Sequence, residues 1–214
     1  MEKLQFAIVA TDILIMRKND DIVEVAVQTV DRPPHYININ AFIGGVLHPD
    51  ETTEQAAKRI ISEKTKLNPK HVFFTPLKFY DRIDRDKRGR VIAIAYLGIM
   101  ENVTDELGVT WLPIHNLRRL AYDHNEMLDD MLTYMKNHLF VTNIALHFMP
   151  KEFTIAKLKT LYEYLLGHEI DKRNFYKFVE ELPIRTTSKL TKEGRGRPAM
   201  LYKKLPTKSF FLSH

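Results

Sequence analysis

The most informative stretch of the chain is GGVLHPDETTEQAAKRIISEKTKL, residues 44–67, which joins a glycine pair to the pattern of a helix. Thr52 or Thr53 can cap that helix, and Glu54 places an anion near the positive end of its dipole. We therefore predict a Gly-hinged loop that leads into a helix, an arrangement that can hold a metal ion and a pyrophosphate. Apolar residues recur along the helix at roughly helical spacing, at Ala56, Ala57, Ile60, Ile61 and Leu67.

This stretch resembles the Nudix box, in which Gly is followed after five residues by Glu, and after seven more by Arg-Glu-apolar-x-Glu-Glu-x-Gly-apolar. Three positions depart from that motif. Ile60 replaces the Glu that follows the motif Arg, Lys64 replaces the second Glu of the pair, and Lys66 replaces the late Gly. The positions that fall on the motif in register are Gly45, Glu51, Arg59, Ile61, Glu63 and Leu67.

The departures bear on metal binding. In Nudix hydrolases the two replaced carboxylates lie four residues apart on one helix face and bind magnesium, which requires oxygen ligands. With Ile60 and Lys64 in their place, the resemblance implies that the metal and the hydrolysis of diphosphates are lost. We therefore assign no catalytic residue, no metal ligand and no cofactor, and we predict that the protein is not an enzyme. The nine His residues show no metal-binding spacing either.

Composition places the chain among ordinary soluble globular proteins, with 214 residues, 44% hydrophobic and 28% charged. No apolar run reaches about 18 residues, so we expect no transmembrane helix. We also expect no signal peptide, because Asp12 interrupts the first apolar run and no small-residue cleavage site follows. The absence of cysteine excludes disulfides and is compatible with the cytoplasm.

The positive charge is concentrated in the last third of the chain. The chain carries a net charge of +5, while residues 151–214 alone hold 14 Lys and Arg against 7 Asp and Glu. A basic terminal module on a nearly neutral body suggests a polyanionic partner, although a solvated surface can have the same composition.

The first two thirds of the chain have the pattern of a mixed sheet around a helix. Residues 4–16 and 22–30 predict a hairpin, residues 36–43 return to extended chain, and residues 72–80 and 91–100 predict two more strands. Three later segments are similar to Nudix proteins that handle ADP-ribose: the charged turn and strand at 86–96, the Trp-apolar-Pro strand end at 109–114, and the aromatic-Asp-His helix start at 121–128. The resemblance implies the α/β/α sandwich of the Nudix fold.

Two groups of residues in this region can each be interpreted in two ways. Arg82, Arg85, Arg88 and Arg90 alternate with acidic residues, so they form either a solvated hairpin or a set of guanidinium groups aimed at a ligand; we take them as candidate ligand-binding residues. The sequence Tyr-Asp-His at 122–124 is either a helix start capped by the Asp or a ligand contact.

The basic tail has the pattern of a helix-turn-helix. Residues 153–166 form an amphipathic helix that ends at Gly167, and Asp171 then caps a second helix over residues 172–182. Phe175, Phe178 and Val179 mark the buried face of this second helix. Its outward residues are candidate DNA contacts, with Arg173 and Asn174 as candidates for base edges: Lys172, Arg173, Asn174, Tyr176 and Lys177.

A basic, Gly-rich turn completes a winged version of this motif. Residues 184–187 and 200–205 can pair as strands around the turn 189–198, which would let Arg195 and Arg197 reach phosphate or the minor groove. The alternative is a flexible, solvated hairpin.

The combination closely resembles the Nudix-related transcriptional regulators of bacteria, in which a Nudix-like ligand-sensing domain precedes a winged helix. The motifs on which this resemblance rests are LLG at 165–167, DKRNF at 171–175 and GRGRPAMLY at 194–202. The resemblance implies an α+β protein with a sensing domain at 1–147 and a DNA-binding domain at 148–214. It also implies a homodimer that represses transcription from a double-stranded DNA operator and responds to ADP-ribose or a related nucleotide.

Three alternatives remain beside this hypothesis. Some regulators of the family respond to a sugar and control sugar-utilisation genes. An active ADP-ribose pyrophosphatase is the second, because Glu51 and Glu63 could hold a metal together with a backbone carbonyl. The third is an interaction scaffold that binds neither nucleotide nor sugar.

Overall fold

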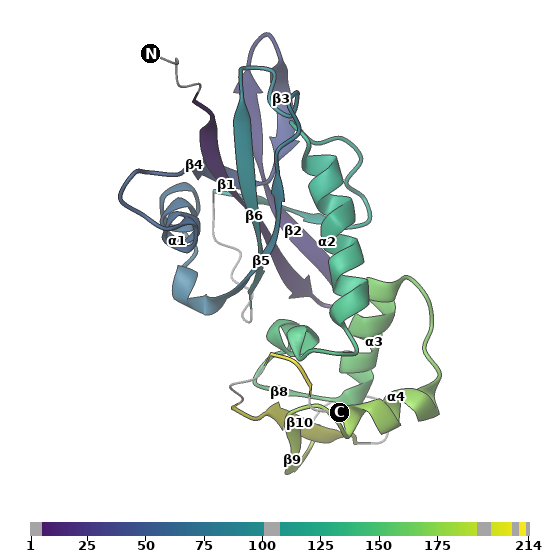
Figure 1. Cartoon of the computed structure of the whole chain (residues 1–214). Helices are drawn as coiled ribbons and strands as arrows, with labels where there is room; N and C mark the ends of the chain where they lie inside the picture. Colours follow the sequence, from purple (N-terminus) through teal and green to yellow (C-terminus); the bar gives the residue numbers. More distant parts are fainter. Residues whose placement is uncertain (1–5, 101–107, 192–197, 207–209, 213–214) are drawn as a thin grey trace. The chain divides into compact units, whose positions relative to one another are not determined.

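The computed structural model describes residues 6–100, 108–191, 198–206 and 210–212, and the chain divides into two compact units (Figure 1). Unit 1 comprises Met1–Arg17 and Glu24–Met131, and unit 2 comprises Lys18–Val23 and Leu132–His214. Among the described residues, no helix is long and apolar enough to cross a membrane.

Unit 1 is built on a mixed sheet in the order β3-β2-β1-β6-β5, with β4 paired to β1 and β7 paired to β2. The pairing of β1 with β6 is parallel, from Ile8 opposite Val91 to Arg17 opposite Met100, whereas β5 and β6 are antiparallel. The strands are β1 (Ile8–Asn19), β2 (Ile22–Arg32), β3 (Tyr36–Ala41), β4 (Ile43–Val46), β5 (Val72–Tyr80), β6 (Val91–Met100) and β7 (Thr110–Pro113). The predicted hairpin and the two later strands are confirmed.

Helix α1 (Thr53–Lys64) follows β4 and begins where the sequence predicts. Thr52 is its cap: the Thr52 hydroxyl accepts from the Gln55 N–H at 3.2 Å, and the Gln55 side chain accepts from the Thr52 N–H at 2.7 Å. The helix stops before Thr65, whose hydroxyl binds the Ile61 carbonyl at 2.7 Å, so Leu67 is buried just beyond the helix rather than within it.

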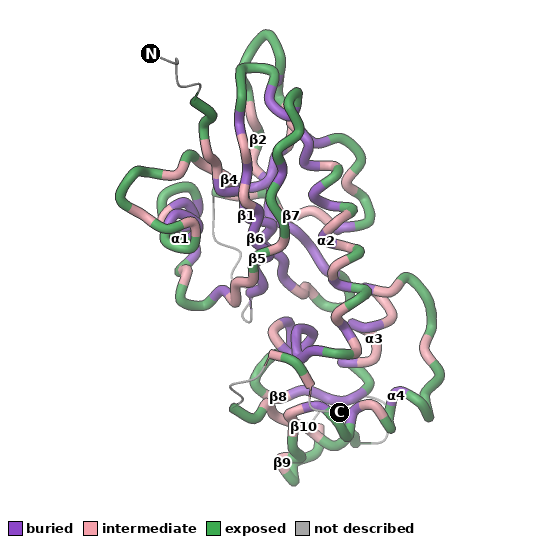
Figure 2. The backbone as a smooth tube through the Cα atoms, viewed as in Figure 1, coloured by how far each residue is buried: buried purple, intermediate pink, exposed green. Residues whose placement is uncertain are grey.

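One face of α1 packs on the sheet. Ala56, Ala57, Ile60 and Ile61 are fully buried in a core with residues of β1, β2, β4 and β6, and Figure 2 shows this buried face turned toward the strands. Burial of each isoleucine contributes about 1.5–3 kcal/mol to the packing of the helix. The 3-10 turn η1 (Pro69–His71) then leads into β5.

Helix α2 (His124–His138) starts in unit 1, where its first turns lie on the opposite side of the sheet from α1 (Figure 1). A mixed sheet between two helical layers is the α/β/α sandwich that the sequence predicts.

The glycine pair lies in a strand, so the predicted Gly-hinged loop is wrong at this point. Gly44 and Gly45 belong to β4 and pair with Asp12 and Thr11 of β1. The reason for glycine is space, because a Cβ atom on Gly44 would lie 1.9 Å from Oδ1 of Asp12. Glycine at position 44 therefore makes room for a carboxylate in the sheet.

Unit 2 contains the predicted helix-turn-helix and wing. Helix α3 (Ile155–Leu166) is capped by Thr154 and ends at Gly167, whose φ of 78° is the left-handed conformation that favours glycine. Helix α4 (Lys172–Val179) is capped by Asp171, which accepts from the Asn174 N–H at 2.8 Å. The small sheet has the order β8-β10-β9, and the 3-10 turn η2 (Ile144–Phe148) precedes it.

The strands of this sheet are β8 (Glu152–Phe153), β9 (Ile184–Leu190) and β10 (Met200–Lys204). Four boundaries differ from the prediction, one of them the end of β10 at Lys204 instead of 205. Phe153 belongs to β8 instead of the first helix, the second helix ends at Val179 instead of 182, and β9 continues to Leu190 because Met200 pairs with it.

Aromatic packing holds α3 and α4 together. The ring of Tyr162 lies 5.1 Å from that of Phe175 and 5.6 Å from that of Phe178, and Phe140 packs against both Tyr162 and Phe178. The Tyr162 hydroxyl donates to the Leu139 carbonyl at 2.9 Å, which satisfies it in the core.

Candidate functional site

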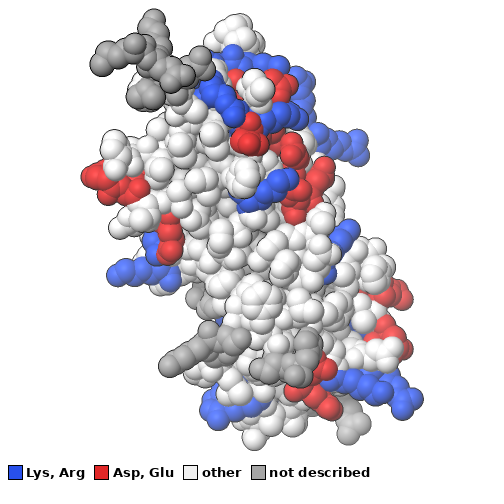
Figure 3. All heavy atoms as spheres, viewed as in Figure 1, with Lys and Arg blue, Asp and Glu red and all other residues white. Residues whose placement is uncertain are grey.

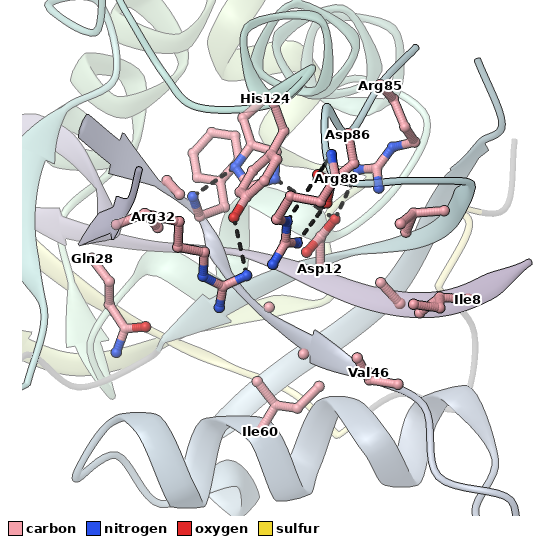
Figure 4. Close-up of a pocket in the computed structure, with 18 of the residues that line it drawn as sticks. Ile8, Asp12, Gln28, Arg32, Val46, Ile60, Arg85, Asp86, Arg88 and His124 are labelled. Carbon is pink, nitrogen blue, oxygen red and sulfur yellow. Dashed lines mark hydrogen bonds and ion pairs between the residues drawn. The ribbon is translucent and has the colours of Figure 1, made fainter. Parts of the chain in front are cut away.

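A pocket of about 450 Å³ lies in unit 1 between the sheet and α1. Its walls come from β1, β2, β4, the second half of α1, the loop between β5 and β6, and the residues that lead into α2 (Figure 4). A cavity of this size is ordinary for a small-molecule site, which typically encloses roughly 300–1,000 Å³.

The remaining carboxylates of the box are bound to Arg59. Its guanidinium donates to both oxygens of Glu51, at 2.9 and 2.6 Å, to Glu63 at 2.9 Å, and to the Val46 carbonyl at 3.0 Å. Hydrogen bonding from Arg59 lowers the pKa of Glu51 to about 2. The ion pair joins the loop that contains Glu51 to α1, and the bond to the Val46 carbonyl joins the end of β4 to the same helix.

A buried ion-pair network crosses the other wall of the pocket. Arg85 donates to both oxygens of Asp123 at 2.8 Å and to Asp12 at 3.2 Å, and all three side chains are almost completely buried. The carboxylate of Asp123 is therefore engaged with Arg85, which differs from the capping role considered from the sequence. The guanidinium links the loop between β5 and β6 to both β1 and the start of α2.

His124 completes this network in a defined tautomer. Its Nδ1 accepts from the Phe42 N–H at 2.9 Å, so the ring proton resides on Nε2, which faces Oδ2 of Asp12 at 3.7 Å. Burial by itself would raise the pKa of Asp12, but contact with His124 and the guanidinium of Arg85 hold it below its ordinary value. Asp12 is thus an anion within the pocket wall.

Tyr122 brings two arginines to the mouth of the pocket. Its φ of 59° lies in the left-handed region, which is uncommon for an aromatic residue. The ring lies under the guanidinium of Arg88, at 5.6 Å, and the hydroxyl accepts from Arg32 at 3.3 Å. Arg88 is also bound to Asp86, at 2.9 and 2.5 Å. Figure 4 shows Arg32 and Arg88 directed into the same space above Ile60.

The structure divides the predicted arginine cluster. Arg85 and Arg88 line the pocket, whereas Arg82 and Arg90 do not. Arg82 is exposed and pairs with Asp84 at 2.8 Å, and Arg90 donates to the Asp81 carbonyl at 2.6 Å. Basic and acidic side chains are intermixed on the surface at this end of unit 1 (Figure 3).

Several residues that line the pocket are not predicted as site residues from the sequence. Asp12 lies inside an apolar strand, and Arg32 precedes a pair of prolines, so neither belongs to a motif. Asp12 could have been recognised as a site residue because it is an acidic residue within a strand predicted to be buried, and a buried charge needs a partner. Lys64 was assigned only as a departure from the box, although it also lines the pocket.

The remaining box residues do not fit a metal ion. Ile60 and Lys64 present no oxygen to the pocket, and the carboxylates of Glu51 and Glu63 both bind Arg59. Among the described residues, no group of three or more His, Cys, Asp or Glu side chains could hold a metal.

The second candidate site is the outer face of α4. Phe175 and Val179 of this helix are buried, and the predicted contact residues lie on its exposed face, with Arg195 and Arg197 of the wing turn outside the described residues. Unit 2 thus combines a basic and polar helix face with the antiparallel strands β9 and β10, and these are the two parts that a winged helix presents to DNA. The exposed residues are Lys172, Arg173, Asn174, Tyr176 and Lys177.

Family models match both units of the chain. A NUDIX domain matches residues 7–131, and the NrtR DNA-binding winged helix domain matches residues 145–203.

Two curated relatives match parts of the chain. The chain is 24% identical over 165 residues to the "ADPR responsive transcriptional repressor NtrR" of Acinetobacter baylyi, covering 73% of this chain and 65% of the relative. It is 33% identical over 99 residues to the "ADP-ribose pyrophosphatase" of Methanocaldococcus jannaschii, covering 44% of this chain and 57% of the relative. Each match therefore spans less than two thirds of the relative's own length.

A solved structure matches nearly the whole chain. NrtR of Shewanella oneidensis, in a complex with a 27mer DNA, superposes with a TM-score of 0.80 at 25% identity, covering 95% of this chain and 96% of that one. The similarity extends across both the sandwich and the winged helix.

Proposed function

We propose that this chain, which belongs to the NUDIX family, is a transcriptional repressor that binds DNA through its winged helix and responds to ADP-ribose bound in the unit 1 pocket. The observation that carries the proposal is the presence, in one chain, of a cationic NUDIX pocket and an NrtR-type winged helix. Binding to DNA would place the protein in the cytoplasm of a bacterium.

ADP-ribose is the effector that the pocket and the relatives favour together. Both curated relatives are named for ADP-ribose, one as a repressor and the other as a pyrophosphatase. The cationic residues that line the pocket suit a diphosphate better than a neutral sugar. Neither the sugar-sensing alternative nor the scaffold is favoured by these observations.

The pocket supports binding without hydrolysis. A Nudix-type hydrolase needs carboxylate oxygens for magnesium, and in this chain those positions hold Ile60 and Lys64 while Glu51 and Glu63 are bound to Arg59. Of the candidate ligand-binding residues, we propose Arg88 as a direct contact, because its side chain is exposed at the mouth of the pocket. Arg85 is a structural residue of the pocket wall, because it is buried and binds both Asp12 and Asp123.

DNA binding is assigned to the exposed face of α4 and to the wing. Lys172, Lys177, Arg195 and Arg197 would contact phosphates, while Arg173 and Asn174 would reach base edges. A homodimer would place two such helices about one turn of DNA apart on an operator, and ADP-ribose would bias their placement.

Fluorescence anisotropy with the DNA upstream of the protein's own gene tests the proposal. We expect binding at micromolar protein that weakens steeply with salt and is reversed by ADP-ribose. Absence of salt-sensitive binding would contradict the DNA assignment. Magnesium-dependent turnover of ADP-ribose by the purified chain, well above background, would contradict the loss of catalysis.

The DNA assignment also predicts the size of the salt effect. Lys172→Gln and Lys177→Gln should each reduce the slope of log K against log salt by about one, since each removes one phosphate contact. Lys58→Gln, on the exposed face of α1, is the matched control and should leave the slope unchanged. An unchanged slope in both α4 variants would show that this helix face does not lie on the phosphates.

A further inference from the structure

Two cationic side chains of the pocket have no carboxylate partner among the residues that the structure describes. Arg59, Arg85 and Arg88 each bind a carboxylate, at 2.6, 2.8 and 2.5 Å. Arg32, in contrast, donates to the hydroxyl of Tyr122, and Lys64 donates to the carbonyl of Gly44, both of which are uncharged groups. Within the described part of unit 1, neither Arg32 nor Lys64 therefore forms a direct ion pair with a carboxylate.

These two cations act on the same space from opposite walls. Arg32 ends β2 on the sheet side of the pocket, and Lys64 ends α1 on the helix side. Burial, followed by the charge of Arg32, lowers the pKa of Lys64, while the carboxylates of Asp12 and Glu63 act in the opposite direction. Like charges facing one partly closed cavity raise its free energy unless an anion lies between them.

The space between them suits a diphosphate. A diphosphate group carries two negative charges, one for each cation, and an Arg fork with a Lys point charge is a common combination for phosphate oxygens. A divalent cation would face the ammonium of Lys64 and the apolar side chain of Ile60. The nearby carboxylates already have cationic partners, because Glu51 and Glu63 bind Arg59 and Asp12 binds Arg85. The donor set thus fits an anion and does not fit a metal.

We propose that Arg32 and Lys64 form a site that binds a diphosphate group directly, without a divalent cation. The inference rests on the proposed function, because it assigns the diphosphate of ADP-ribose to these two side chains. The proposal also gives Lys64 a second role. Its ammonium group replaces the positive charge of the metal ion whose ligand is missing at this position.

Isothermal titration calorimetry of the full chain, with inorganic pyrophosphate, ADP-ribose and adenosine as separate probes, tests this site in EDTA and again in excess magnesium. We expect pyrophosphate and ADP-ribose to bind in EDTA, magnesium not to tighten either, and adenosine to bind far more weakly. Adenosine lacks the diphosphate, so it separates the anion site from recognition of the base.

Variants at Lys64 assign the site to this residue. Lys64→Met should weaken pyrophosphate binding roughly 10- to 100-fold, the effect of losing one charge-assisted contact, whereas Lys64→Arg should retain most of it. Lys58→Met is the control on the same helix, since Lys58 is exposed and paired with Glu54 at 2.6 Å, and it should bind like the wild type.

The outcomes separate this inference from the proposed function. Binding of pyrophosphate only with magnesium, or unchanged binding in Lys64→Met, would overturn the inference even if ADP-ribose still releases DNA. Pyrophosphate binding in EDTA that depends on Lys64, with no binding of ADP-ribose, would support the inference and contradict the choice of effector.

Discussion

Arg85 and Arg32 line the same pocket, but they differ in burial and in the charge of the groups that they contact. Arg85 is 4% exposed and donates to two carboxylates, whereas Arg32 is exposed and donates to a neutral hydroxyl. The number of cations in a pocket is thus a poor guide to its affinity for anions, because a guanidinium already paired with carboxylates has little attraction left for a ligand. What matters is which charges the fold leaves without a partner.

The largest expected effect tests whether Arg85 stabilises the fold. Arg85→Met should lower the free energy of unfolding by about 3–5 kcal/mol, because it leaves the carboxylates of Asp12 and Asp123 buried without a cation. Urea denaturation measures the change. Arg82→Met is the matched control: its pair with Asp84 is exposed, so we expect a change of about 0–1 kcal/mol. Equal stability of the two variants would show that the buried network does not hold the loop between β5 and β6.

Arg32 should show the reverse behaviour. Arg32→Met should weaken ADP-ribose binding roughly 10- to 100-fold while changing the free energy of unfolding by less than about 0.5 kcal/mol, since the side chain is exposed and makes one contact to Tyr122. Calorimetric titration and urea denaturation of the same preparation give both numbers. Arg90→Met, outside the pocket, should alter neither; a similar loss of affinity there would indicate a general charge effect instead of a site.

The smallest effect concerns Glu51, which Arg59 holds ionised. Its pKa is about 2 in the folded chain against an ordinary value of 4.5, so its ion pair stabilises the fold fully above pH 4.5 and is lost as the pH falls toward 2. Glu51→Gln should therefore be less stable than the wild type near neutral pH, and the difference should shrink below pH 4.5. Urea denaturation over a pH series checks this, with Glu54→Gln as an exposed control. A difference that stays constant with pH would contradict the ion pair's contribution.

Local patterns predicted the elements of this fold well. Side-chain period and capping chemistry predict the strand at residues 72–80, a helix cap at Thr52 or Thr53, the end of α3 at Gly167 and the start of α4 after Asp171. The structure selects Thr52 as the cap. The sequence does not predict β8, because a strand of two residues is too short to show an alternating pattern. It does not predict β4 either, because a glycine pair resembles a loop unless the strand that pairs with it, here β1, is known.

The pocket was harder to predict because its contacts are distant in sequence. Arg85 and Asp12 are 73 residues apart, and Arg32 and Tyr122 are 90 apart, so no local pattern contains either pair. The four arginines of residues 82–90 look alike in sequence, and only the positions of Asp12, Asp123 and Asp86 distinguish the buried one from the exposed ones. The roles of α4 and the wing in binding DNA stay predictions from charge and shape.

The close approach of Gly44 to Asp12 links two positions that must change together. A Cβ atom at position 44 would lie 1.9 Å from the carboxylate of Asp12, so a larger residue there requires a smaller or absent side chain at position 12. In an alignment of related chains we expect these two columns to covary, with Asp at 12 only where 44 is Gly.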